Sequence, residues 1–331
     1  MSFQNLAGNE HLKKRLGQFI TTRKILNSYV FAGESGIGKK TVSNMFVSAI
    51  LCEAPSAGGA CNNCAACKQF LSDNHPDVIY LQKSKDKKTL GIEEVREQII
   101  KQVYIKPFIA QKKIFVINDG DSLTPEAQNG LLKVLEEPPE YVTFIILVSK
   151  KSLLLDTVLS RSCVFDLRPV TKLTVIDFLK NEYPSKTNDE HLFYAKFSQG
   201  VIGKAMKIAA DAEFKAMFFD TSKFLSSTMQ KKSALVDFHR YLLDNKENIN
   251  TITDFMLIFL RDCIFSCEGL DDMIICPQNL DSISTSQADK KKFTSTMDSV
   301  IKYKNNLLSN ANFTVLTLNL LIEIQANCNI N

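Results

Sequence analysis

A chain of 331 residues, 45% of them hydrophobic, can bury a substantial core, and its length predicts two or three domains. Its apolar runs are too short to cross a bilayer, and no charged start followed by an apolar segment is present, so we expect a cytoplasmic protein without a membrane span. A formal net charge of +4 neither establishes nor excludes contact with nucleic acid, which would require a local basic patch.

The first half of the chain alternates short β-branched runs with amphipathic segments. Strands separated by helices predict a parallel sheet covered on both faces, that is, an α/β domain. The expected strands are 28–33, 77–81, 113–119 and 141–149, and the expected helices begin at Lys39, near Ile92 and near Pro125.

The segment "GESGIGKKT" lies between the first strand and the first of these helices. Its order of strand, G-x-x-x-x-G-K and helix is typical of a loop whose backbone amides hold phosphates. Gly33, Gly36 and Gly38 permit the close turn, and Lys39 would reach the β- and γ-phosphates. A glycine-rich turn without a ligand is the alternative.

The residue after Lys39 normally supplies a hydroxyl to Mg²⁺, but here it is Lys40. Thr41 follows one residue later, rotated about 100° around the helix, and therefore does not simply replace the missing hydroxyl. A cation at position 40 would also repel the metal ion.

The end of the strand "KIFVIND" should supply the acidic groups for metal binding and water activation. When the segment is aligned with the usual Asp–Glu pair, Asn118 replaces the metal-orienting Asp and the shorter Asp119 replaces the Glu. When the alignment is shifted so that Asp119 becomes the metal ligand, Gly120 takes the position of the base. The hydrolytic set is incomplete in both alignments. We expect Asp121 to cap the turn and helix that follow.

Four of the nine cysteines crowd into one segment, with the spacing C-x8-C-x2-C-x2-C. Such spacing suits a tetrahedral Zn²⁺ with four thiolate ligands and no open position, which predicts a structural metal site at Cys52, Cys61, Cys64 and Cys67. A set of reduced cysteines in a loop is the alternative. His75 offers a further possible ligand, but packing or hydrogen bonding is the preferred interpretation.

After about residue 166 the β-signal fades, and apolar residues recur at helical spacing, as in 254–265 and 312–324. This half should be all-helical. The polar segment 180–191 should separate two short helices, and 267–287 should form a loop-rich break.

These features, in this order, resemble the clamp-loader branch of the AAA+ family. The resemblance spans about residues 1–166 and depends on the phosphate loop, the four-cysteine insertion, "HPDV", "GIEEVREQI", "LLKVLEEPP" and "DTVLSRSCVFDL". It implies an AAA+ domain over 1–166 with a zinc module at about 52–67, a helical lid over 167–210 and a helical collar over 211–331. In the lid, Lys204 stands where related ATPases often carry the arginine of the second sensor.

The family has a Ser-Arg-Cys motif whose arginine serves as a finger for the nucleotide of a neighbouring subunit. It matches Ser160 and Arg161, with Ser162 in place of the cysteine and Cys163 one residue later. The resemblance therefore implies that Arg161 acts in trans. An arginine at the start of a helix can instead simply pair with a nearby carboxylate.

The resemblance implies a non-hydrolysing clamp-loader subunit of the replicative DNA polymerase III holoenzyme. Its partners would be the delta subunit and the ATP-hydrolysing tau/gamma subunits, with the sliding clamp and primer–template DNA reached through the complex. ATP or ADP binding at the degenerate loop stays open. Two alternatives remain: the tau/gamma-type motor itself, and a zinc-stabilised nucleic-acid-binding protein using lysines of "KSKDKK" and "DKKKF".

Overall fold

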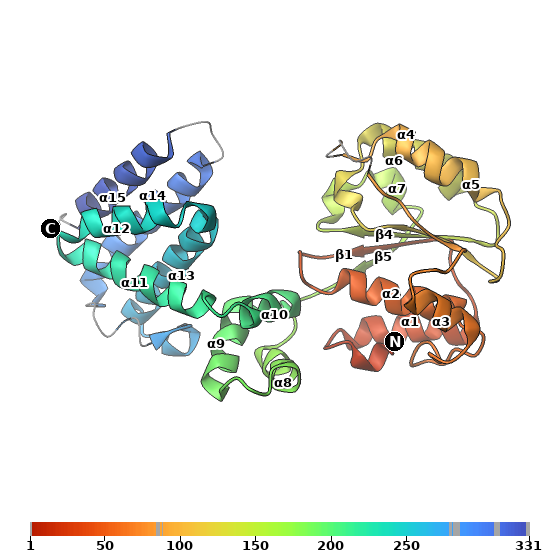
Figure 1. The fold of residues 1–331 in the computed structure, drawn as a ribbon, viewed down its shortest axis with the longest axis horizontal. Helices are drawn as coiled ribbons and strands as arrows, with labels where there is room; N and C mark the ends of the chain where they lie inside the picture. Colours follow the sequence, from red (N-terminus) through yellow and green to blue (C-terminus); the bar gives the residue numbers. More distant parts are fainter. Residues whose placement is uncertain are drawn as a thin grey trace. The chain divides into compact units, whose positions relative to one another are not determined.

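The computed structural model describes residues 2–83, 87, 89–277, 280, 285–307 and 312–328. The chain divides into two compact units (Figure 1). The first comprises 1–191 and 198–206, and the second comprises 192–197 and 207–331. The three-domain division at 166/167 and 210/211 stays a prediction.

The first unit is built on a five-stranded parallel sheet with the strand order β2-β3-β4-β1-β5. β1, β3 and β4 are buried along their whole length, as expected for apolar strands at the centre of a covered sheet. The strands are β1 (Ser28–Ala32), β2 (Val78–Tyr80), β3 (Lys113–Ile117), β4 (Val142–Val148) and β5 (Cys163–Asp166).

Helices cover both faces of this sheet, so the predicted α/β architecture is confirmed (Figure 1). Tyr29 and Phe31 of β1 pack into the core on the face of α1 to α3, whereas Val30 and Ala32 pack on the opposite face, with α4 to α7. The helices are α1 (Glu10–Thr22), α2 (Lys39–Leu51), α3 (Ala65–Leu71), α4 (Ile92–Val95), α5 (Lys101–Val103), α6 (Pro125–Glu136) and α7 (Asp156–Leu159).

The register of the sheet brings distant loops to one edge. Ala32 pairs with Val148 and Ile117 pairs with Ile146, so β1, β3 and β4 end side by side. The loops after parallel strands meet at this carboxyl edge, where open α/β sheets place their ligands. The phosphate loop and the segment after β3 therefore become neighbours.

A buried carboxylate fixes the loop between α5 and β3. Asp77 is fully buried and accepts hydrogen bonds from the amides of Phe108, Ile109 and Ala110 at 2.5, 2.9 and 2.8 Å. Burial raises the pKa of Asp77, but these amide bonds outweigh it and leave the pKa below its ordinary value. Ionised Asp77 therefore stabilises the fold.

We expect Asp77→Ala to lower the free energy of unfolding by about 3 kcal/mol, because three amides lose a charged acceptor. The Asp77 contribution is fully present above the unfolded-state pKa near 4 and is lost as the pH falls through the lower folded-state pKa. Urea unfolding between about pH 3 and 7 measures both effects. The exposed Asp177→Ala is the control; an equal loss in both variants would refute the role of Asp77.

Three further helices follow the sheet: α8 (Lys172–Glu182), α9 (Asn188–Ser198) and α10 (Ile202–Ala210). The polar segment 180–191 contains the break between α8 and α9, as predicted. The compact units divide within α9, so its residues 192–197 belong to the second unit.

The second unit is all-helical in its described residues, as predicted. A hydrophobic core lies among five long helices and contains Phe238, Phe259 and Phe293, each 0–1% exposed. The predicted break at 267–287 falls between α13 and α14, and residues 278–279 and 281–284 lie outside the described part. The helices are α11 (Phe214–Gln230), α12 (Ala234–Asp244), α13 (Ile249–Cys267), α14 (Lys290–Asn306) and α15 (Phe313–Cys328).

Within the described ranges, no helix has both the length and the apolar character needed to cross a membrane.

Candidate functional site

Three glycines shape the loop between β1 and α2. Gly33, Gly36 and Gly38 have φ values of +154°, +83° and +106°, which residues with a Cβ rarely adopt. Gly33 also lies close to Leu167, whose carbonyl oxygen would be 3.0 Å from a Cβ at Gly33. The first amides of α2 have no partner within their helix, so this loop can present donors to an anion.

Lys39, the first residue of α2, folds back onto this loop. Its ammonium group donates to the carbonyl oxygens of Gly33, at 2.5 Å, and Glu34, at 3.1 Å. Burial lowers the pKa of Lys39, and the carboxylates of Asp121 and Glu34 oppose the shift. The ammonium group of Lys39 therefore lies against the backbone of the loop.

Lys40 and Thr41 are exposed in the first turn of α2. Position 40 offers an ammonium group in place of the hydroxyl oxygen that a magnesium ion requires. This first turn therefore lacks the metal ligand that the loop usually provides.

The start of α10 lies against the same loop. The amide of Gly203 donates to the carbonyl oxygen of Gly36 at 2.9 Å. A Cβ at Gly36 would lie 3.2 Å from the amide nitrogen of Lys204, and a Cβ at Gly203 would lie 2.6 Å from the Gly36 oxygen. The fold therefore brings residue 204, the candidate second-sensor position, beside the phosphate loop.

Asn118 and Asp119 follow β3 directly, at the edge where the phosphate loop lies. The Asp119 carboxylate forms an ion pair with Lys83, which comes from the segment after β2. Sequence reasoning missed Lys83, because only the pairing of β2 with β3 brings these two segments together. The Asp119 carboxylate is therefore partnered by a lysine.

The prediction that Asp121 caps the following turn and helix is wrong. Its carboxylate accepts a hydrogen bond from the amide of Ser149, at 2.6 Å, and so binds the end of β4. The parallel register places that amide beside the turn after β3. Thr124 is the residue that caps α6, through a bond from the amide of Ala127 at 3.2 Å.

Arg161 lies in the turn between α7 and β5. Its guanidinium group forms an ion pair of 2.7 Å with Glu136, the last residue of α6. It also donates to the Thr157 carbonyl oxygen at 3.0 Å and to the Ser160 hydroxyl at 3.2 Å. The Arg161 side chain is 36% exposed.

Partly buried hydrogen bonds support the turn that carries Arg161. The Ser162 hydroxyl donates to the Val158 carbonyl oxygen at 2.9 Å and lies 2.7 Å from the hydroxyl of Ser28 in β1. Gln128 of α6, which is 2% exposed, accepts from the amide of Leu155 at 2.7 Å, just before α7. These bonds attach the turn to the sheet and to α6.

The four predicted cysteines come together at the end of α2 and the start of α3. Their Sγ atoms all lie within 4.8 Å of one another. A tetrahedral Zn²⁺ with Zn–S distances of about 2.3 Å would place its sulfur ligands roughly 3.8 Å apart. The group is therefore compact enough for a metal ion after small adjustments; it comprises Cys52, Cys61, Cys64 and Cys67.

Backbone amides stabilise negative charge on the Cys61 sulfur. The Cys61 sulfur accepts from the amides of Asn63 and Cys64 at 3.5 and 3.4 Å, and these bonds lower the pKa of Cys61 to about 6. Burial raises the pKa of Cys67 to about 12. His75 lies outside the cluster; its Nδ1 accepts from the amide of Asp77 at 3.2 Å.

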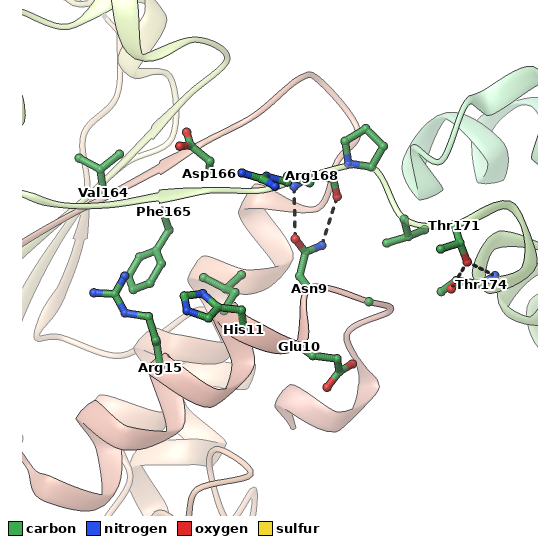
Figure 2. A pocket seen from close by; sticks show the side chains of 14 residues that line it. Asn9, Glu10, His11, Arg15, Val164, Phe165, Asp166, Arg168, Thr171 and Thr174 are labelled. Atoms are coloured by element: carbon green, nitrogen blue, oxygen red, sulfur yellow. Dashed lines mark hydrogen bonds between the residues drawn. The ribbon is translucent and has the colours of Figure 1, made fainter.

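A pocket of about 540 Å³ opens between α1 and β5 (Figure 2). Asn9 exchanges two hydrogen bonds with the backbone of Arg168, at 3.2 and 3.3 Å, and the Arg15 guanidinium lies over the Phe165 ring at 4.9 Å. None of the predicted site residues lines this pocket. It is therefore separate from the phosphate loop, and the sequence offered no motif by which to find it.

Comparison with known proteins identifies subunits of DNA polymerase III among the relatives of this chain. The family profile described as "DNA polymerase III, delta subunit" matches residues 8–171. The delta' subunit of Bacillus subtilis is 26% identical over 321 residues, which cover 94% of each chain. The gamma/tau subunit of Mycoplasma genitalium is 28% identical over 267 residues, 77% of this chain but 44% of that protein.

The chain thus spans less than half the length of the gamma/tau and tau relatives that it matches. Among solved structures, a gamma subunit-related protein of Thermotoga maritima aligns with 96% of this chain and 99% of its own, at 16% identity. Its TM-score is 0.45, too low to support a conclusion.

Proposed function

This chain belongs to the delta'-type clamp-loader subunits of DNA polymerase III, and we propose that it does not hydrolyse ATP itself but assists hydrolysis by a neighbouring subunit. In this proposal Arg161 is the arginine finger. It would stabilise the charge that develops on a γ-phosphate bound by the adjacent ATPase subunit during loading of the sliding clamp on primed DNA.

The missing metal-binding hydroxyl carries this proposal. Lys40 stands at the position of that hydroxyl, and Asn118 and Asp119 stand where the acidic pair is expected. Arg161 is kept on a turn that is bonded to the sheet and to α6, with 36% of its side chain exposed. These features favour loss of hydrolysis within the chain and retention of a group that acts on another chain.

We further propose that the loop retains a degenerate nucleotide site. Gly33, Gly36, Gly38 and Lys39 would hold the phosphates of ATP or ADP, with Thr41 and Lys204 nearby. With Lys40 beside the phosphates, bound nucleotide would lack a well-placed magnesium ion. Binding would then occur without turnover.

The cysteine cluster is proposed to hold a structural Zn²⁺. Four thiolates would fill the tetrahedral coordination of the ion and leave no position for substrate. The metal would join the end of α2 to the start of α3, because Cys52 is the C-cap of α2 and Cys64 the N-cap of α3.

The proposed partners are the delta subunit and the tau/gamma ATPase subunits, assembled in the cytoplasm through the helical second unit. The sliding clamp and primer–template DNA would be engaged by the whole complex. Two lysine segments are candidates for DNA contact. In the first, 83–88, residues 84–86 and 88 lie outside the described residues. In the second, 289–293, Lys290 and Lys292 form ion pairs with Glu268 and Asp289, respectively.

Reconstitution tests this function. Purified chain is mixed with delta and tau/gamma subunits and passed over a sizing column, and ATP turnover is measured with the clamp and primed DNA. We expect a stable complex whose turnover falls when this chain is left out. A complex that forms and turns over ATP equally well without it would contradict the proposal.

The tau/gamma-type motor is the second candidate, favoured by the similarity of this chain to gamma/tau subunits. That role requires a metal-binding hydroxyl and an acidic pair after β3. Lys40 and the Lys83–Asp119 ion pair argue against it.

A further inference from the structure

The Arg161 side chain is held at both of its terminal nitrogens. The NH2 group donates to Glu136, and the NH1 group donates to Thr157 and Ser160. Because the guanidinium group is planar and rigid, contacts at two nitrogens fix the orientation of its plane. Five N–H donors are available, so donors remain for an incoming phosphate.

Glu136 differs from the other two partners because it lies on a separate element. Thr157 lies in α7 and Ser160 caps that helix, both within four residues of Arg161, whereas Glu136 ends α6. A long arginine side chain has many rotamers, and local contacts alone leave its direction poorly defined. A charged partner on a neighbouring helix supplies the missing restraint.

The two helices involved are themselves fixed to each other. Gln128 in the first turn of α6 donates to the carbonyl oxygen of Leu153 at 3.0 Å and accepts from the amide of Leu155 at 2.7 Å. Both bonds reach the segment that leads into α7. The distance from the end of α6 to the Arg161 turn is therefore set by the fold, and Glu136 acts from a firm position.

We propose that Glu136 is a positioning residue for Arg161: its carboxylate holds the guanidinium group in the orientation from which it meets the phosphate of the neighbouring subunit. This inference rests on the finger role proposed above. An exposed ion pair contributes little to stability, so its role lies in orientation and not in folding. Misorientation of a catalytic group is costly even when the group is still present.

The test uses the complete reconstituted complex with this chain in saturating amount. We expect Glu136→Ala to lower kcat at the ATP site that faces this chain by about 3–10-fold with little change in KM, because the lost orientation matters in the transition state; total turnover should fall by no more than the share of that site. Glu136→Gln keeps an oxygen acceptor and should recover at least about half of the wild-type turnover. Glu97→Ala, which breaks the exposed Glu97–Lys101 pair, is the matched control and should leave turnover unchanged.

A double-mutant cycle shows whether Glu136 acts through Arg161. In an Arg161→Ala background, Glu136→Ala should cause no further loss, since the residue that it orients is absent. A further loss of equal size, or a single Glu136→Ala variant as active as or more active than wild type, would overturn the inference. If Arg161→Ala itself leaves turnover unchanged, the finger role fails and the inference falls with it; if only the Glu136 variants behave like wild type, the finger role survives. Melting temperatures confirm that each variant is folded.

Discussion

Replacement of Arg161 by alanine is expected to abolish most ATP turnover at the site that faces this chain. Arginine fingers are worth about 10³–10⁵ in rate, because a fixed cation stabilises charge that develops only in the transition state. Total ATP turnover of the complex should fall by the fraction that this one site contributes, and the rate of clamp loading should fall with it. Arg161→Lys should rescue little, because an ammonium group lacks the planar fork.

Arg161 is partly exposed and its contacts are local or at the surface, so the variant should fold and assemble normally. Single-turnover ATP hydrolysis and sizing chromatography of the reconstituted complex separate catalysis from assembly. The matched control is Arg168→Ala: Arg168 is an exposed arginine of the same unit whose backbone, not its side chain, binds Asn9. Equal turnover in the Arg161→Ala and wild-type complexes would count against the finger.

Loss of the cysteine cluster should have the largest effect on stability. Cys67→Ser is expected to eliminate bound zinc and to lower the free energy of unfolding by at least about 3 kcal/mol, since structural zinc binds folded protein with a large free energy. A loss of that size corresponds to roughly 6–12 °C in melting temperature. Elemental analysis and thermal unfolding measure the two effects.

Cys163→Ser is the control, because Cys163 is a partly buried thiol outside the cluster. It should retain one zinc ion per chain and a nearly unchanged melting temperature. Metal-free protein that unfolds at the same temperature as the zinc-containing form would remove the structural role of the cluster.

Local sequence patterns predicted most of the fold and the cysteine cluster. Apolar β-branched runs gave β1, β3 and β4, because buried parallel strands need such residues on both faces. The edge strand β5 was not predicted: it has four residues, and only Phe165 among them is buried. The cysteine cluster was predicted because its four residues lie close together in the sequence, so that a single loop and the start of one helix bring them together.

Contacts that depend on tertiary structure were missed. Lys83 reaches Asp119 only through the pairing of β2 with β3, and Glu136 reaches Arg161 only because α6 ends beside the turn after α7. No motif spacing indicates either pair. The same limitation explains Asp121, whose partner amide at Ser149 lies at the end of a neighbouring strand.

ATP hydrolysis by the purified chain alone tests the central claim most directly. The account predicts background turnover with Mg²⁺, unchanged by Lys39→Ala, together with a rise in turnover when the chain joins its ATPase partners. Brisk hydrolysis by the isolated chain, lost in Lys39→Ala, would contradict the account and identify the chain as a motor.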